Sequence, residues 1–472
     1  MSLDVALDTL PAGALAHYAW GHYRIWLSPE AAAQAPDFAM HSIAQVIAGS
    51  AQWPDAQSFA CFVALLHEFV HYQQDVGTGC GHWDALAREA MVSEVLYEAR
   101  NQSWFPKQPL PLPAAQSQDL ADRYAESSLF NLYRRRKSAA LASLRAEVIG
   151  SPAYTPGCEA DLGIDALLEL DAVLAVQRVV HRMRTDEHGR KITAGARHLY
   201  APLDMPDAYR RPYELMLDCF RELFFGTRSE IGHKDVEHLL DTMELVAPVL
   251  LDIAFAHPPP SYFTGPRTGD RPHFEPGLRW LRAVRSIESA SDCRLGDVYA
   301  DVERITRSGA GYDYPSLQTI YQDWAAEFET RAPKDPVAVW RLEQCRQRLK
   351  HPQAIERRDL PNVISHGLPL LLDSPSWPSA RLLVTGRLLS DDGALYGGLR
   401  ESGALLALAQ WFLGGSPGGF ACPHADSQWC SAALASCRSG HAAIWNLPQS
   451  ADCQVRRGLD HWAFQLDAPL PL

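Results

Sequence analysis

The stretch ALLHEFVHYQQD, residues 64–75, places His67, Glu68 and His71 inside a run that is otherwise as apolar as a protein core. Burying an unpaired ionised group costs several kcal/mol, so a chain rarely carries such groups in its core without a partner. Either the three side chains satisfy one another, or they hold a ligand in common.

Apolar residues recur at helical spacing on both sides of this group, from Phe59 to Val76. Pro54-Asp55 is typical of a helix start, and Gly77 is typical of a helix end. A glycine-rich turn, GTGCG at 77–81, precedes a second helical pattern over 82–100. A short turn between two helices favours antiparallel neighbours, so the sequence predicts a helical hairpin here.

On a helix, positions 67 and 71 lie one turn apart and project in the same direction, so both imidazoles can face one atom. Glu68 is rotated by about 100° from His67, within reach of a water held at that atom. This arrangement is the HExxH motif, with two zinc ligands and a general base on one helix. The sequence therefore predicts a Zn²⁺ site with His67 and His71 as ligands and Glu68 as the catalytic base.

Residues 58 to about 100 resemble the active-site helix pair of zincin metallopeptidases, on the strength of His67-Glu68-Phe69-Val70-His71 and the helix that follows. The metzincin branch continues with Gly and His soon after the second histidine, where this chain has Gln74 and Gly77. The gluzincin branch takes its third ligand, a glutamate, from the following helix. The resemblance thus implies a gluzincin-like site.

Three glutamates on that second helix are candidates for the third ligand: Glu89, Glu94 and Glu98. In an antiparallel pair Glu89 lies level with His71, and its Arg-Glu-Ala setting resembles the one that gluzincins often use. Glu94 is the alternative, because Glu98 one turn later could support it as an outer carboxylate. Glu89 is the predicted ligand, and Glu94, Glu98 or a residue remote in the sequence remain open.

The resemblance implies a metallopeptidase that acts on peptide or protein substrates. Zn²⁺ would keep an open position for water, and Glu68 would take a proton from that water and pass it to the leaving amine. The alternatives are a catalytically silent zincin-fold protein with a binding or assembly role, and a metal-dependent hydrolase of a non-peptide amide.

A long irregular stretch, 257–277, supplies candidates for stabilising the oxyanion of such a reaction: His257, Tyr262 and His273. A second irregular stretch is expected at 186–206. Loops of this length inside a compact domain are uncommon and are often lids or binding loops when they are ordered.

The predicted fold is α+β and predominantly α-helical, with a zincin-like core, a small sheet and extra helices. The segment 17–28 has the alternating aromatic and β-branched pattern of a strand. Helical patterns are expected over the following ranges: 117–149, 162–185, 206–225, 233–256, 277–290, 315–331 and 335–350. Near residue 355 the sequence changes from successive helical patterns to a mixture of strand and helix patterns. We therefore predict a catalytic region over 1–355 and a smaller α+β domain over 356–472. Strands of that domain are expected at ARLLVTGRLL and WAFQLDAPL.

The C-terminal region carries cysteines and histidines within a short span: Cys422, His424, Cys430, Cys437 and His441. Their spacings differ from the paired C-x2-C of zinc knuckles, which favours core cysteines over a second zinc site. If the protein has a protein partner, the C-terminal domain is where we expect it to bind.

Composition narrows the function classes. The 472 residues carry 43 Lys and Arg against 56 Asp and Glu, a formal charge of −13, which argues against nucleic-acid binding. No stretch of about 18 apolar residues predicts a membrane span, and the first residues lack a secretory signal pattern. Cytoplasmic location and reduced cysteines are the expectation.

Overall fold

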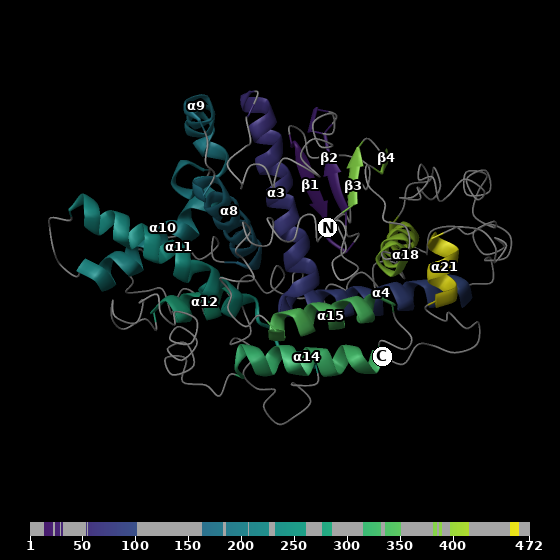
Figure 1. The fold of residues 1–472 in the computed structure, drawn as a ribbon. Helices are drawn as coiled ribbons and strands as arrows, with labels where there is room; N and C mark the ends of the chain where they lie inside the picture. Colours follow the sequence, from purple (N-terminus) through teal and green to yellow (C-terminus); the bar gives the residue numbers. More distant parts are fainter. Residues whose placement is uncertain are drawn as a thin grey trace.

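The computed structural model describes residues 14–21, 24–28, 30–31, 53, 55–101, 163–182, 186–205, 207–225, 232–260, 276–285, 315–331, 336–350, 381–384, 387–388, 397–414 and 454–461. Within these ranges the protein is predominantly helical, as predicted, and strands are few (Figure 1). None of the helices in the described part is long and apolar enough to cross a membrane.

The helix that carries the histidines is α3, Ala56–Gly77. It begins where the sequence predicts, because the Asp55 side chain accepts a hydrogen bond from the Ser58 amide at 2.7 Å. Most of its side chains are buried, including Phe59, Phe62 and Tyr72. Figure 1 shows α3 in the middle of the molecule, with helices on one side and the sheet on the other.

The predicted antiparallel hairpin does not form. Only Thr78 separates α3 from α4, Gly79–Asn101, and α4 runs across the end of α3 instead of returning beside it (Figure 1). The glycines permit close packing at this corner: a Cβ at Gly79 would overlap the His257 backbone, and one at Gly81 would overlap the Asp75 carbonyl oxygen. Their lack of side chains therefore serves the helix junction rather than a loop.

The buried carboxylate of Asp75 links several segments at the junction of α3 and α4. Asp75 is fully buried, and its oxygens accept from Arg88 Nη2 at 2.8 Å, from the Tyr18 hydroxyl at 3.0 Å and from the Gly21 amide at 2.9 Å. Arg341 also donates to its backbone carbonyl at 2.8 Å. Burial would raise the pKa of Asp75, but the charges of Arg88 and Arg341 lower it below its ordinary value, so the carboxylate stays ionised.

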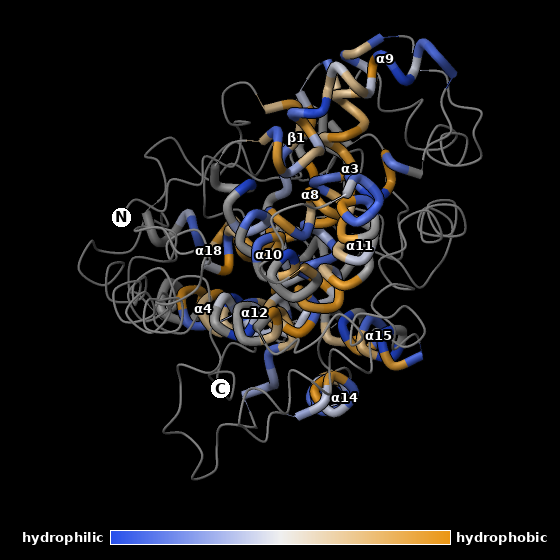
Figure 2. Tube along the Cα trace, turned by 90° about the vertical axis from the view of Figure 1, so that its left-hand side faces the viewer, coloured by the Kyte–Doolittle hydropathy of each residue, from blue (hydrophilic) through white to orange (hydrophobic). Residues whose placement is uncertain are grey.

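The helix α8, Ile164–Arg182, packs along α3 and faces two hydrophobic cores. Leu167 and Leu170 belong to one core, whereas Val176 and Val179 belong to the other, which also includes the buried face of α3. In Figure 2 the apolar segments of α3, α8 and α11 gather at the centre of the molecule. Because α8 is packed on both sides, the position of its side chains relative to α3 is well defined.

The first core is completed by further helices: α10 (Asp207–Phe225), α11 (His233–Phe255), α12 (Pro276–Arg285), α14 (Leu317–Arg331) and α15 (Pro336–Lys350). These helices confirm the helical patterns predicted over 206–225, 233–256, 277–290, 315–331 and 335–350. The predicted helix over 117–149 lies outside the described residues.

The stretch 186–206, expected to be irregular, is instead ordered as a series of short helices: α9 (Glu187–Gly195), η3 (Arg197–Leu199) and η4 (Pro202–Asp204). The Asp186 side chain caps α9 by accepting from the Gly189 amide at 2.7 Å. Tyr200 then belongs to the hydrophobic core that includes the buried face of α3, and Ile192 packs against that core. α9 is mostly exposed and Gly189 is its buried residue, so it lacks the buried apolar stripe by which the other helices were predicted.

The strand predicted over 17–28 is two strands, β1 (Ala16–Ala19) and β2 (Arg24–Leu27), which pair antiparallel. The break falls at Gly21, whose φ of 75° is readily adopted by glycine. In the described part of the sheet the order is β1-β2-β3-β4, with β1 at the edge beside α3.

The other two strands come from the C-terminal region. β3 (Arg381–Val384) pairs parallel with β2, and β4 (Arg387–Leu388) pairs antiparallel with β3. α18 (Gly397–Gly414) packs on α4, and α21 (Gln454–His461) packs on α18. The predicted strand in ARLLVTGRLL is confirmed, and it joins the sheet that β1 and β2 form. The domain boundary near 355 stays a prediction. WAFQLDAPL and the Cys422–His441 cluster lie outside the described residues.

Candidate metal centre

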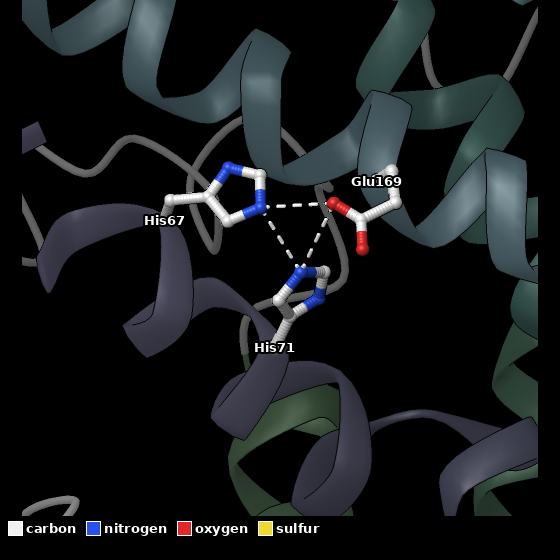
Figure 3. Close-up of side chains that lie close together, drawn as sticks. All are labelled: His67, His71 and Glu169. Atoms are coloured by element: carbon white, nitrogen blue, oxygen red, sulfur yellow. Dashed lines mark hydrogen bonds and ion pairs between the residues drawn. The ribbon is translucent and has the colours of Figure 1, made fainter. Parts of the chain in front are cut away.

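Three potential metal ligands converge between α3 and α8. They are Nε2 of His67, Nε2 of His71 and Oε2 of Glu169 (Figure 3). His67 Nε2 lies 2.9 Å from Glu169 Oε2, and His71 Nε2 lies 3.1 Å from His67 Nε2 and 3.4 Å from Glu169 Oε2. The three atoms therefore form a nearly equilateral triangle.

The histidines meet for the reason that the sequence predicts, since residues 67 and 71 are one turn apart on α3. The carboxylate comes from a different helix than predicted, because Glu169 lies on α8, 102 residues after His67. Glu89 and Glu94 lie on α4, are partly buried and do not belong to this group.

The choice of Glu89 depended on an antiparallel second helix, and α4 instead crosses the end of α3 (Figure 1). The side chain of Glu98 lies outside the described residues. A signal for Glu169 was present in the sequence: it is an acidic residue between Leu168 and Leu170, inside the apolar helix pattern of 162–185. That signal is too common to select one carboxylate without knowledge of which helix packs on α3.

The triangle can be compared with the dimensions of zinc sites. Zn²⁺ binds His nitrogen and carboxylate oxygen at about 2.0–2.2 Å in tetrahedral geometry, which separates neighbouring ligand atoms by about 3.3 Å. The observed separations are 2.9, 3.1 and 3.4 Å. Two histidines and one glutamate also match the ligand type of catalytic zinc sites, which leave a fourth position open. The residues fit a zinc ion.

Charge supports the same interpretation. Burial would raise the pKa of Glu169, but hydrogen bonds from His67 and His71 lower it well below the ordinary value. Burial would lower the pKa of His71, but the hydrogen bond and charge of Glu169 outweigh burial and raise it to about 9. The carboxylate and its neighbours thus create a place that favours a positive charge, carried either by a proton or by a metal cation.

Glu68 points from α3 toward the sheet. Its Oε2 accepts a hydrogen bond from the backbone amide of Tyr18 in β1, with an N···O distance of 2.6 Å. Among the described residues its other carboxylate oxygen has no hydrogen-bond partner. The edge strand therefore holds one carboxylate oxygen of Glu68, the residue that follows His67 on α3.

The three candidates for oxyanion stabilisation have different outcomes. His257 is buried near the α3–α4 corner, where its Nδ1 donates to the Pro258 carbonyl at 2.9 Å and its own carbonyl accepts from Trp324 at 2.6 Å. Burial and the charge of Arg279 lower the pKa of His257 to about 3. These contacts suit a structural residue. Tyr262 and His273 lie outside the described residues.

Comparisons of the chain with protein-family models, with curated proteins and with solved structures found no match.

Proposed function

We propose that this protein is a zinc-dependent hydrolase that cleaves peptide bonds, with His67, His71 and Glu169 as metal ligands and Glu68 as general base. The observation that carries the proposal is the triangle of His67 Nε2, His71 Nε2 and Glu169 Oε2, which has the size and the donor types of a catalytic zinc site.

When bound there, a zinc ion supplies a Lewis acid that polarises a carbonyl group and lowers the pKa of a water molecule. Glu68 is suited to the proton transfers. One of its oxygens accepts from the Tyr18 amide, and the other would take a proton from the attacking water and return it to the leaving amine. A purely structural zinc site has no use for such a residue.

The test compares wild type with Glu68→Gln, using Glu94→Gln as a matched control on α4. Zinc is measured by mass spectrometry after purification without chelators, and cleavage is measured on unfolded protein and on internally quenched peptides. We expect stoichiometric zinc in all three proteins. Cleavage is expected to fall by about 10²–10⁴-fold in Glu68→Gln alone, the usual contribution of general acid–base catalysis.

Two results would contradict the proposal in different ways. Wild type that binds zinc but cleaves no peptide would reject the peptidase activity and leave the metal centre. Wild type that retains no zinc, even after incubation with the metal, would reject the centre itself.

A further inference from the structure

Gln74 lies one turn beyond His71 on α3, and its side chain is buried with an exposed fraction of 2%. Its amide has three partners. Oε1 lies 2.8 Å from His71 Nδ1, while Nε2 lies 2.9 Å from the Leu168 carbonyl oxygen and 2.8 Å from Asp171 Oδ2. Each polar atom of the side chain is thus engaged, which is what a buried amide requires.

These contacts decide which way the amide faces. The Leu168 carbonyl can only accept a hydrogen bond, so the amide nitrogen of Gln74 must lie on that side. The oxygen consequently faces His71. Because this oxygen can only accept, Nδ1 of His71 must carry a proton. In the metal-bound protein His71 is therefore left with Nε2 as its ligand atom, and this is the atom that faces His67 and Glu169.

The same side chain also holds α8. Leu168 and Asp171 stand on either side of Glu169 in the sequence, one position before it and two positions after it. By donating to both, Gln74 links the helix of the histidines to the helix segment that carries the third ligand.

We propose that Gln74 is a positioning residue of the metal centre, which sets the ligand nitrogen of His71 and at the same time fixes Glu169 against α3. The inference rests on the metal centre of the proposed function. It goes beyond that function because it concerns a residue outside the ligand set.

The first test measures zinc affinity by competition with a chromophoric chelator for wild type, Gln74→Met and Gln73→Met. Methionine has a similar length but offers neither the acceptor nor the donors of the amide. Gln73 is partly buried on the same helix, so it controls for the substitution itself. We expect Gln74→Met to bind zinc about 10–100-fold more weakly, the usual effect of losing an outer-shell partner, and Gln73→Met to match wild type.

The outcomes separate this inference from the proposed function. Zinc-binding wild type with equal affinity in Gln74→Met would overturn the role of Gln74 and leave the centre intact. Absence of zinc binding in wild type would overturn both.

A second measurement does not depend on the folding of Gln74→Met. In the cobalt-substituted wild type, the His71 Nδ1 proton should give a hyperfine-shifted ¹H NMR signal that disappears in D₂O. A nuclear Overhauser effect between this proton and the Gln74 side chain assigns it to His71, because His71 Nδ1 lies 2.8 Å from Gln74 Oε1. A wild-type spectrum in which His71 contributes no such exchangeable signal would overturn the inference.

Discussion

The backbone amide of Tyr18 lies 2.6 Å from Glu68 Oε2, while the hydroxyl of the same residue lies 3.0 Å from Asp75 Oδ2. Tyr18 thus contacts α3 at two carboxylates that are almost two helical turns apart. One is the predicted general base and the other is the buried carboxylate of the α3–α4 corner. Through this residue, β1 is fixed along the helix that carries the candidate site.

Replacing Tyr18 by Phe should reveal the strength of that attachment. A hydrogen bond to a charged group contributes about 1.5–3 kcal/mol, compared with about 1 kcal/mol for a neutral acceptor. Tyr200→Phe is the matched control, because the Tyr200 hydroxyl donates to the neutral Thr193 carbonyl at 3.0 Å. We expect the larger drop in melting temperature for Tyr18→Phe. Equal drops would show that the bond to Asp75 adds nothing beyond a neutral contact.

The identity of the third ligand is tested by Glu169→Gln, Glu89→Gln and Glu94→Gln. A neutral amide is a much poorer zinc ligand than a carboxylate, and here it would also remove the charge that faces both histidines. Glu169→Gln should therefore lose zinc on dialysis, while the two α4 variants keep it. Zinc loss in Glu89→Gln with retention in Glu169→Gln would instead support the ligand predicted from sequence.

The metal-free protein should become less stable as pH rises. The pKa of His71 is raised from an ordinary 6.5 to about 9 in the folded state, so its protonation contributes stability that is fully present below about pH 6.5. That contribution is lost as pH rises through about 9. The melting temperature of chelator-treated protein should fall across this window. Glu169→Gln, which lacks the partner, should show a flatter profile.

Bound zinc should offset this loss of stability at higher pH, because the metal competes with the proton of His71. Zinc affinity is therefore expected to increase with pH over the same window, with proton release measurable by calorimetry in buffers of different ionisation enthalpy. Zinc binding that releases no proton at pH 7 would contradict the coupling.

The glycines of the α3–α4 corner provide a test of the fold. A Cβ at Gly81 would overlap the Asp75 carbonyl oxygen, whereas nothing lies within 4 Å of a Cβ at Gly195, the last residue of α9. Gly81→Ala should destabilise by about 1–3 kcal/mol through overpacking. Gly195→Ala should be neutral or stabilise by up to about 1 kcal/mol, because alanine is the better helix residue. Melting temperatures that shift in the same direction would contradict this account.

Local pattern alone was enough to predict α3, its start at Asp55 and the common direction of His67 and His71. These features depend on helical spacing and capping, which act over a few residues. The third carboxylate could not be predicted in this way. It depends on which helix packs against α3. Local sequence pattern does not show this, because Glu169 lies 102 residues after His67.

The same limit explains the other differences. The composition of GTGCG predicts a turn, but in the structure the segment is a junction between two helices. The His257 backbone lies close to Gly79, and the Asp75 carbonyl oxygen lies close to Gly81. β3 joins β2 from more than 350 residues away, as the pairing of Arg24 with Arg381 shows. The sequence by itself determined the two histidines, the glutamate between them and the helix that presents them. Only tertiary packing decided that α8, held by Gln74, brings Glu169 to complete the group.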